Sequence, residues 1–190
     1  MSPRRTVIVV PLKDFNVAKS RLRSSFSNSE LDALARRLAE GVVRAAGPRE
    51  CVLASDAAAV REFALRCGVP YLSVSAGGLN AAVNDALAQL RGAYDVAVIA
   101  HGDLAHPVGL GDYEFADGVT VVTDRHGTGT NVMAIPLESE FVVHYGVNSA
   151  VAHEREAHAH GLSVRTITDS PWGLDIDEPA DWELAQAPRT

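Results

Sequence analysis

The chain has 190 residues, and 47% of them are hydrophobic, which suffices for one domain with a full core. The formal net charge of −7 argues against binding to nucleic acid or to anionic membranes, because phosphate surfaces require a basic partner. It allows a small anionic substrate held by a few cations or a metal ion. There is neither an apolar run of membrane-spanning length nor a signal-peptide cleavage site, so we expect a cytoplasmic protein.

Short apolar runs alternate with amphipathic stretches along the whole chain. We expect strands at 6–11, 50–55, 69–74, 94–100, 119–122, 132–136 and 163–168. We expect helices from the capping box at Ser27 to Ala45, at 57–67, 79–90 and 148–160, and from Pro179 onward. The most apolar strand, 94–100, is placed at the centre of the sheet. The alternation predicts a single three-layer α/β domain over residues 1–190 with a mainly parallel, mixed sheet, in which ligands bind beyond the carboxyl ends of the strands.

Three cations follow the first strand, which ends at Pro11. They are Lys13, Lys19 and Arg21, and the two lysines are the only ones among 17 basic residues. Such a loop could neutralise a triphosphate, because a lysine ammonium acts as a point charge toward phosphate. A solvated basic turn would explain the same residues equally well.

Three aspartates lie where a metal ion could be bound. Asp103 directly follows the expected central strand, and Asp175 and Asp177 alternate with apolar residues near the C-terminus. In an extended chain the last two carboxylates point to the same side, with Cα atoms roughly 7 Å apart. Carboxylates without nearby Cys or His favour Mg²⁺ over Zn²⁺. The alternative is that Asp103 and Asp177 only cap the turn or helix that follows each of them.

Other loops at the same edge of the sheet carry residues suited to ligand binding. Gly77 and Gly78 allow a backbone to approach a ligand, and Asn80 could donate to a base or ribose, or merely cap its helix. The segment 124–131 is rich in Gly and Thr, and 145–149 precedes a helix, whose N-terminus favours phosphate.

The histidines of the helix at 148–160 do not form a zinc-protease motif. His153 and His158 are five residues apart, whereas that motif requires four for both to share a helix face. We therefore expect His153, His158 and His160 to be surface residues.

Taken together, these segments resemble the guanylyltransferases of deazaflavin (coenzyme F-420) biosynthesis, which form a guanosine diphosphate ester of 2-phospho-L-lactate, phosphoenolpyruvate or a related acid. The resemblance covers nearly the whole chain and rests on five motifs, at 10–22, 78–82, 101–104, 124–131 and 174–181. It implies a Rossmann-like nucleotidyltransferase fold, with GTP and a phosphorylated acid as substrates, and it leaves open whether the chain forms a homo-oligomer. Two departures from the family pattern are Tyr145 to Ser149, in place of Phe-Gly-x-Gly-Ser, and Ala105, in place of proline.

The resemblance also implies roles for individual residues. The expected Mg²⁺ ligands are Asp103, Asp175 and Asp177, and the expected catalytic residues are Lys13, Lys19, Arg21 and Asp103. The nucleotide is expected at Pro11, Lys13, Gly78, Leu79 and Asn80, and the acid at Thr130, Asn131, Gly146 and Ser149. The alternatives are a nucleotidyltransferase for sugar phosphates or molybdopterin, which would not be expected to share segment 124–131, and a non-catalytic nucleotide-binding module.

Overall fold

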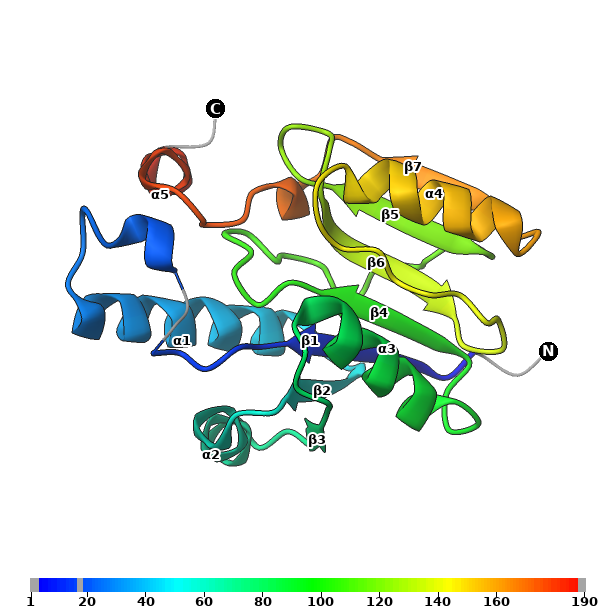
Figure 1. Ribbon diagram of the computed structural model, residues 1–190, viewed down its shortest axis with the longest axis horizontal. Helices are drawn as coiled ribbons and strands as arrows, with labels where there is room; N and C mark the ends of the chain where they lie inside the picture. Colours follow the sequence, from blue (N-terminus) through cyan, green and yellow to red (C-terminus); the bar gives the residue numbers. More distant parts are fainter. Residues whose placement is uncertain (1–3, 17–18, 188–190) are drawn as a thin grey trace.

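A seven-stranded mixed sheet organises the chain in the computed structural model, which describes residues 4–16 and 19–187 (Figure 1). Its strands are β1 (Thr6–Pro11), β2 (Glu50–Ser55), β3 (Tyr71–Ser73), β4 (Val96–Ala100), β5 (Val119–Thr123), β6 (Thr130–Pro136) and β7 (Val164–Ile167). The strand order is β3-β2-β1-β4-β6-β5-β7, so β4 is central, as expected. All pairs are parallel except those that β6 makes with β4 and β5. The predicted mainly parallel, mixed sheet is confirmed.

Helices cover both faces of this sheet (Figure 1). They are α1 (Asn28–Ala45), α2 (Ala58–Cys67), α3 (Leu79–Leu90), α4 (Ser149–Ala159) and α5 (Pro179–Gln186), with two 3-10 turns at Ser20–Leu22 and Pro171–Gly173. Side chains alternate along β1: Ile8 and Val10 pack with α1 and α2, whereas Val7 and Val9 pack with α3 and α4. This alternation produces the three layers that the sequence predicts.

Local sequence signals explain where α1 begins and where α2 ends. Ser27 and Glu30 form the predicted capping box, in which the Ser27 backbone N–H donates to Glu30 Oε2 over 2.8 Å and the Glu30 N–H donates to Ser27 Oγ. Gly68 ends α2 in the left-handed conformation, with φ of 69°. No helix in the described ranges has both the length and the apolar character needed to cross a membrane.

The reversed direction of β6 decides which residues meet at the edge of the sheet where β4 and β5 end and where ligands are expected. Ala100 pairs with Val132, and Thr123 pairs with Thr130. The beginning of β6 therefore lies where β4 and β5 end. Thr130 and Asn131 are consequently brought to the same edge as the loop that follows β4.

Candidate active site

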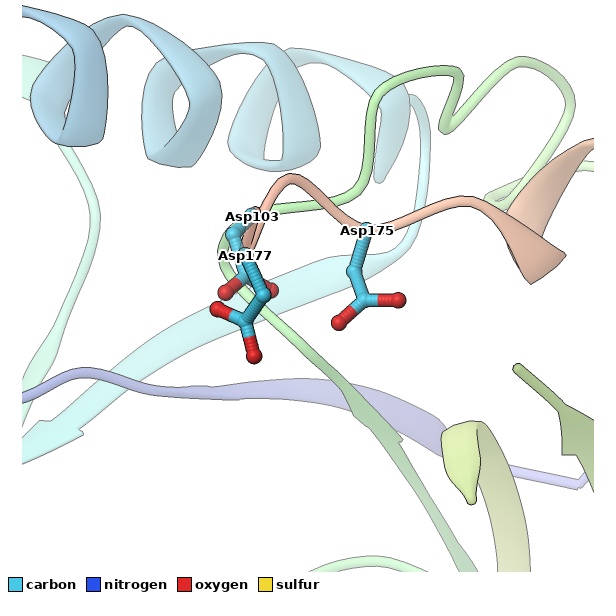
Figure 2. Close-up of side chains that lie close together, drawn as sticks. All are labelled: Asp103, Asp175 and Asp177. Carbon is cyan, nitrogen blue, oxygen red and sulfur yellow. The ribbon is translucent and has the colours of Figure 1, made fainter. Parts of the chain in front are cut away.

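The three predicted metal ligands gather at this edge of the sheet. Asp103 comes from the loop after β4, and Asp175 and Asp177 come from the extended segment before α5 (Figure 2). One carboxylate oxygen from each lies within 4.8 Å of the others. The sequence prediction that these aspartates meet is confirmed.

Backbone hydrogen bonds hold the two aspartate-bearing segments together. The Ala105 N–H donates to the Leu174 carbonyl over 2.8 Å, and the Ile176 N–H donates to the Asp103 carbonyl over 3.1 Å. Ile176 is fully buried in an apolar cluster with Leu22, Leu31 and Leu34. Because side chains alternate in this extended segment, burial of Ile176 turns its two acidic neighbours toward the site.

The alternative assignment of Asp177 as a helix cap is wrong. Glu178 is the N-cap of α5, and Asp181 provides the reciprocal bond of the capping box. The Asp181 carboxylate also accepts from the Asp177 N–H over 3.0 Å. The carboxylate of Asp177 therefore does not cap the helix and belongs to the cluster of three aspartates.

Lys19 lies between two of the aspartates. Its ammonium donates to Asp103 Oδ2 and, over 3.1 Å, to Asp177 Oδ1, and its side chain is only 5% exposed. Arg21 is 3.8 Å from Asp177 and largely exposed, and Lys13 is exposed. Of the first motif, Val17 and Ala18 lie outside the described residues. The structure therefore brings Lys19 fully into the carboxylate cluster and Arg21 to its edge, whereas it shows no ion pair of Lys13 with these carboxylates among the described residues.

The electrostatic environment differs among these charged groups. Burial alone would raise the pKa of Asp103, but the nearby Lys19 ammonium and His101 outweigh it, and the pKa lies below its usual value. Burial would lower the pKa of Lys19, but its two carboxylate partners raise it. Burial and repulsion from Asp103 raise the pKa of Asp175. Both Lys19 and Asp103 are thus held in their charged forms.

The chemistry of this cluster fits a hard divalent cation. It offers three carboxylates, and Asp103 Oδ1 is a buried atom without a hydrogen-bond partner among the residues that the structure describes. A buried acceptor that lacks a donor is costly, and a cation would satisfy it. Asp103, Asp175 and Asp177 are therefore the residues that could hold Mg²⁺.

A pocket of about 390 Å³ opens beside the cluster, and a second of about 310 Å³ adjoins it. The first is lined by residues including Lys13, Lys19, Arg21 and the three aspartates. Both pockets share the residues Pro11, Leu12, Lys13 and Leu79, and Gly78 lines the second. Four of the five predicted nucleotide-binding residues therefore border one continuous concave surface.

Asn80, the fifth, makes a different connection. Its amide donates to the Tyr145 carbonyl over 3.0 Å and accepts from the Tyr145 N–H over 2.6 Å. Gly78 is the N-cap of α3, so the alternative prediction that Asn80 caps this helix is wrong. Asn80 instead fixes the loop before α4 to α3.

The residues predicted to bind the acid form a connected group on the β6 side. Thr130 and Ser149 are buried, and the Ser149 hydroxyl donates to Thr130 Oγ1 over 3.3 Å. Asn131 donates to Asp175 Oδ1 over 3.1 Å and to the Trp172 carbonyl over 3.0 Å. Gly146 is exposed, with φ of 143°. This group therefore contacts the carboxylate cluster through Asn131.

The expectation that His153 is a surface residue is wrong, because His153 is fully buried. It shares the inner face of α4 with Ala150 and Ala157, three residues before it and four after it. Its Nδ1 lies 3.0 Å from Thr130 Oγ1, and its Nε2 accepts from the His144 N–H over 2.9 Å. Its spacing from the two alanines was the sequence signal for burial. His158 and His160 are exposed, as expected.

Two further polar side chains near the site were not singled out from the sequence. His101 Nε2 and the Tyr145 hydroxyl are buried without a hydrogen-bond partner within the described part of the chain. Their ring centroids are 5.3 Å apart, and the Tyr145 ring also packs edge-on against His153 at 4.9 Å. His101 begins the loop that bears Asp103. Its position directly after an apolar strand was the available signal.

Comparison with known proteins identifies the family of the chain. The profile of the family described as "Guanylyl transferase CofC like" matches residues 6–185. A phosphoenolpyruvate guanylyltransferase of Chloroflexus aggregans is 31% identical over 186 residues, which cover 90% of this chain and 92% of that protein. A 2-phospho-L-lactate guanylyltransferase of Methanocorpusculum labreanum is 29% identical over 91% of this chain and 79% of its own length. A 3-phospho-D-glycerate guanylyltransferase of Colwellia psychrerythraea is 26% identical over 95% of this chain and 90% of its own length.

Solved structures show the same fold at much lower identity. A putative nucleotide-diphospho-sugar transferase of Desulfovibrio desulfuricans G20 superposes with a TM-score of 0.74 at 14% identity, over 96% of this chain and 86% of that one. This likeness concerns the fold alone. The family profile, in contrast, spans nearly the entire sequence, including all three aspartates. The chain therefore belongs to the CofC-like guanylyl transferase family, and it is a nucleotidyltransferase.

Proposed function

We propose that this enzyme transfers GMP from GTP to a small phosphorylated carboxylic acid in the biosynthesis of coenzyme F-420, in the cytoplasm. The observation that carries the proposal is the position of the carboxylate cluster between two groups of residues. Lys19 joins it to the loop after β1, and Asn131 joins it to the buried residues at the start of β6. One metal-binding centre would thus contact both substrates.

The reaction would be a direct displacement at the α-phosphorus of GTP. An oxygen of the acid's phosphate forms the new P–O bond, and the bond to the bridging α,β-oxygen breaks to release pyrophosphate. Mg²⁺ held by Asp103, Asp175 and Asp177 would neutralise the triphosphate and the charge that develops in the transition state. No covalent enzyme intermediate is required.

The residues of the chain would orient the two substrates for this displacement. Lys13, Lys19 and Arg21 provide positive charge for the GTP phosphates. Gly78 has φ of 91° and carries no side chain, so it lets the nucleotide approach the backbone at the start of α3. In-line geometry and charge neutralisation together supply most of the catalysis in reactions of this class.

The acid would bind on the β6 side, at Thr130, Asn131, Gly146 and Ser149. The three relatives act, by their names, on phosphoenolpyruvate, 2-phospho-L-lactate and 3-phospho-D-glycerate. All three acids carry a phosphate and a carboxylate. We propose phosphoenolpyruvate or 2-phospho-L-lactate as the acceptor of this chain.

The test is pyrophosphate release from GTP with Mg²⁺ and each of the three acids side by side. We expect release that requires GTP, one of the acids and the metal, and that stops when EDTA is added. Binding of GTP without turnover of any acid would indicate a non-catalytic module. Turnover with a sugar phosphate in place of the acids would indicate the other class of nucleotidyltransferase.

A further inference from the structure

We propose that His153 is a positioning residue that orients the Thr130 hydroxyl so that its proton is donated to the anionic acid substrate. The proposal rests on the proposed function, because it assigns a role to a side chain behind the acid site. His153 itself is fully buried and does not line the pocket beside the aspartates.

The hydrogen bonds of His153 determine which of its ring nitrogens carries the proton. The His144 backbone N–H donates to Nε2 over 2.9 Å, so Nε2 must present its lone pair. A neutral imidazole has one donor and one acceptor nitrogen, and the proton is therefore on Nδ1. Nδ1 lies 3.0 Å from Thr130 Oγ1, and it consequently donates to that oxygen.

The bond from His153 Nδ1 occupies an acceptor site of the Thr130 hydroxyl, which can then act toward a ligand only as a donor. A hydroxyl oxygen has two acceptor sites and one proton. Thr130 Oγ1 accepts from His153 Nδ1 and also from the Ser149 hydroxyl over 3.3 Å. Within residues 4–16 and 19–187 the Thr130 side chain makes no other hydrogen bond. Its proton is therefore not used by a hydrogen bond within these residues.

A Thr130 hydroxyl that can only donate a hydrogen bond would bind an anionic ligand most strongly. Thr130 belongs to the residues predicted to bind the acid, and its neighbour in the chain, Asn131, bonds Asp175 of the carboxylate cluster. Hydrogen bonds to charged acceptors are about twice as strong as those between neutral groups. A hydroxyl that can only donate also disfavours a ligand that presents a donor there. His153 would thus contribute to selecting a phosphate or carboxylate oxygen.

The surroundings of His153 keep its ring neutral, as the arrangement requires. Burial, together with the smaller effects of the neighbouring His144 and His101, lowers its pKa to about 4, against the opposite effect of Glu156. The rings of Phe141 and Tyr145 pack against it, with centroids 6.1 Å and 4.9 Å away. Near neutral pH the ring therefore remains a fixed donor toward Thr130.

The alternative is that His153 has only a structural role, in which it holds the loop before α4 by accepting from the His144 N–H. Two amide substitutions separate this role from positioning of Thr130. In His153→Asn, the shorter side chain can place an N–H near the former Nδ1, which keeps the donor to Thr130 and loses the acceptor for His144. In His153→Gln, the longer side chain can place its carbonyl near the former Nε2, which keeps the acceptor and loses the donor.

The experiment measures kcat and KM for both substrates in His153→Asn, His153→Gln and Thr130→Val. We expect His153→Gln to raise KM for the acid by about 10- to 100-fold, the loss of a hydrogen bond to a charged group, with KM for GTP unchanged. His153→Asn should stay within about threefold of wild type. The double variant His153→Gln/Thr130→Val should be no worse than the poorer single variant, because both remove one interaction. His158→Gln, exposed on the same helix, is the matched control.

Wild-type acid KM in His153→Gln, or a larger loss in His153→Asn than in His153→Gln, would overturn the proposal. Thermal unfolding of each variant shows whether it is folded. The ¹⁵N chemical shifts of His153 in the wild-type protein provide a test that needs no turnover: we expect a protonated Nδ1, and a protonated Nε2 contradicts the inference. If wild type turns over none of the acids, the proposed function fails, whereas the tautomer is still decided by the spectrum.

Discussion

Two regions meet at the carboxylate cluster, and they differ in how their polar groups are held. The basic loop, residues 11–21, extends from β1, and Lys13 and Arg21 in it are exposed. On the other side, the β6–α4 group consists of the buried residues Thr130, Asn131, Ser149 and His153, which hydrogen-bond to one another or to neighbouring elements. Of the three cations Lys13, Lys19 and Arg21, Lys19 alone has a nearly buried side chain, and its partners are the aspartates.

If the two regions bind the substrates as proposed, the difference teaches that the two binding sites are preorganised to different degrees. The side chains of the β6–α4 group are already buried and hydrogen-bonded, so we expect them to rearrange little when the acid binds. In the basic loop, by contrast, the side chains of Lys13 and Arg21 are exposed, and we propose that the GTP phosphates would order them. Ordering side chains on binding costs about 0.5–1.5 kcal/mol for each one. Changes in the two regions should therefore affect different kinetic constants.

The largest effect is expected where the two regions join. Asp175→Asn keeps an oxygen that can accept from Asn131 but removes the charge that a metal ion requires. Activity should fall by about two orders of magnitude or more, as when a major electrostatic contribution to the transition state is lost. Asp169→Asn, at an exposed position, is the control in the same pyrophosphate assay. Near-normal turnover of a folded Asp175→Asn protein would contradict the metal assignment.

The buried character of the β6–α4 group predicts a pH dependence of stability. The pKa of His153 is lowered from 6.5 to about 4, so between these values the unfolded chain binds a proton that the folded protein does not. The free energy of unfolding should therefore decrease as pH falls, by about 2 kcal/mol between pH 7 and pH 5 from this residue. Urea unfolding at both pH values measures it. His153→Gln should lose less stability over this interval, and equal losses would mean that His153 titrates normally.

The contrast between Lys13 and Lys19 sharpens the description of the basic loop. Lys19→Arg places a larger, forked group between Asp103 and Asp177. We expect kcat/KM for GTP to fall by an amount equivalent to about 1.5–3 kcal/mol of transition-state stabilisation. Lys13→Arg should be tolerated better, because Lys13 is exposed. Steady-state kinetics with varied GTP measures both variants. Normal kinetics in both would mean that backbone N–H groups and metal hold the triphosphate.

A substitution at Gly78 tests the proposed nucleotide-binding residues without changing any charge. Gly78 has φ of 91° and ψ of −178°, a conformation that is essentially restricted to glycine. Gly78→Ala should cost of order 1–2 kcal/mol in stability and raise KM for GTP, and it should weaken the preference for GTP over ATP that we expect near residues 78–82. Gly92→Ala, with φ of 79° and outside both pockets, should affect stability alone. Equal use of ATP and GTP by wild type would remove the proposed guanine preference.

The smallest effect is expected at Ala105, where the family pattern has proline. The Ala105 N–H donates to Leu174, a bond that proline cannot make, so Ala105→Pro should lower the free energy of unfolding by about 1 kcal/mol. Because Ile176 still bonds Asp103, the aspartates should remain together and kcat should change little. Urea unfolding and the pyrophosphate assay measure the two quantities. A large loss of kcat would mean that this single bond sets the geometry of the cluster.

The sequence by itself determined the order of helices and strands, the capping box at Ser27, the central place of β4 and the family. It also determined that Asp175 and Asp177 share a side, because alternation in an extended segment is a local property. Such features depend on residues near one another in the chain, whose patterns of periodicity and capping can be read directly.

Only the tertiary structure decided which distant residues meet. The Lys19–Asp177 pair joins positions 158 residues apart, and the Thr130–His153 bond depends on the antiparallel direction of β6 and the packing of α4. The burial of His153 and the bonds of Asn80 to Tyr145 were likewise missed from the sequence. The physical reason is that the partner of a polar side chain depends on how helices and strands pack, whereas its local pattern permits either exposure or burial.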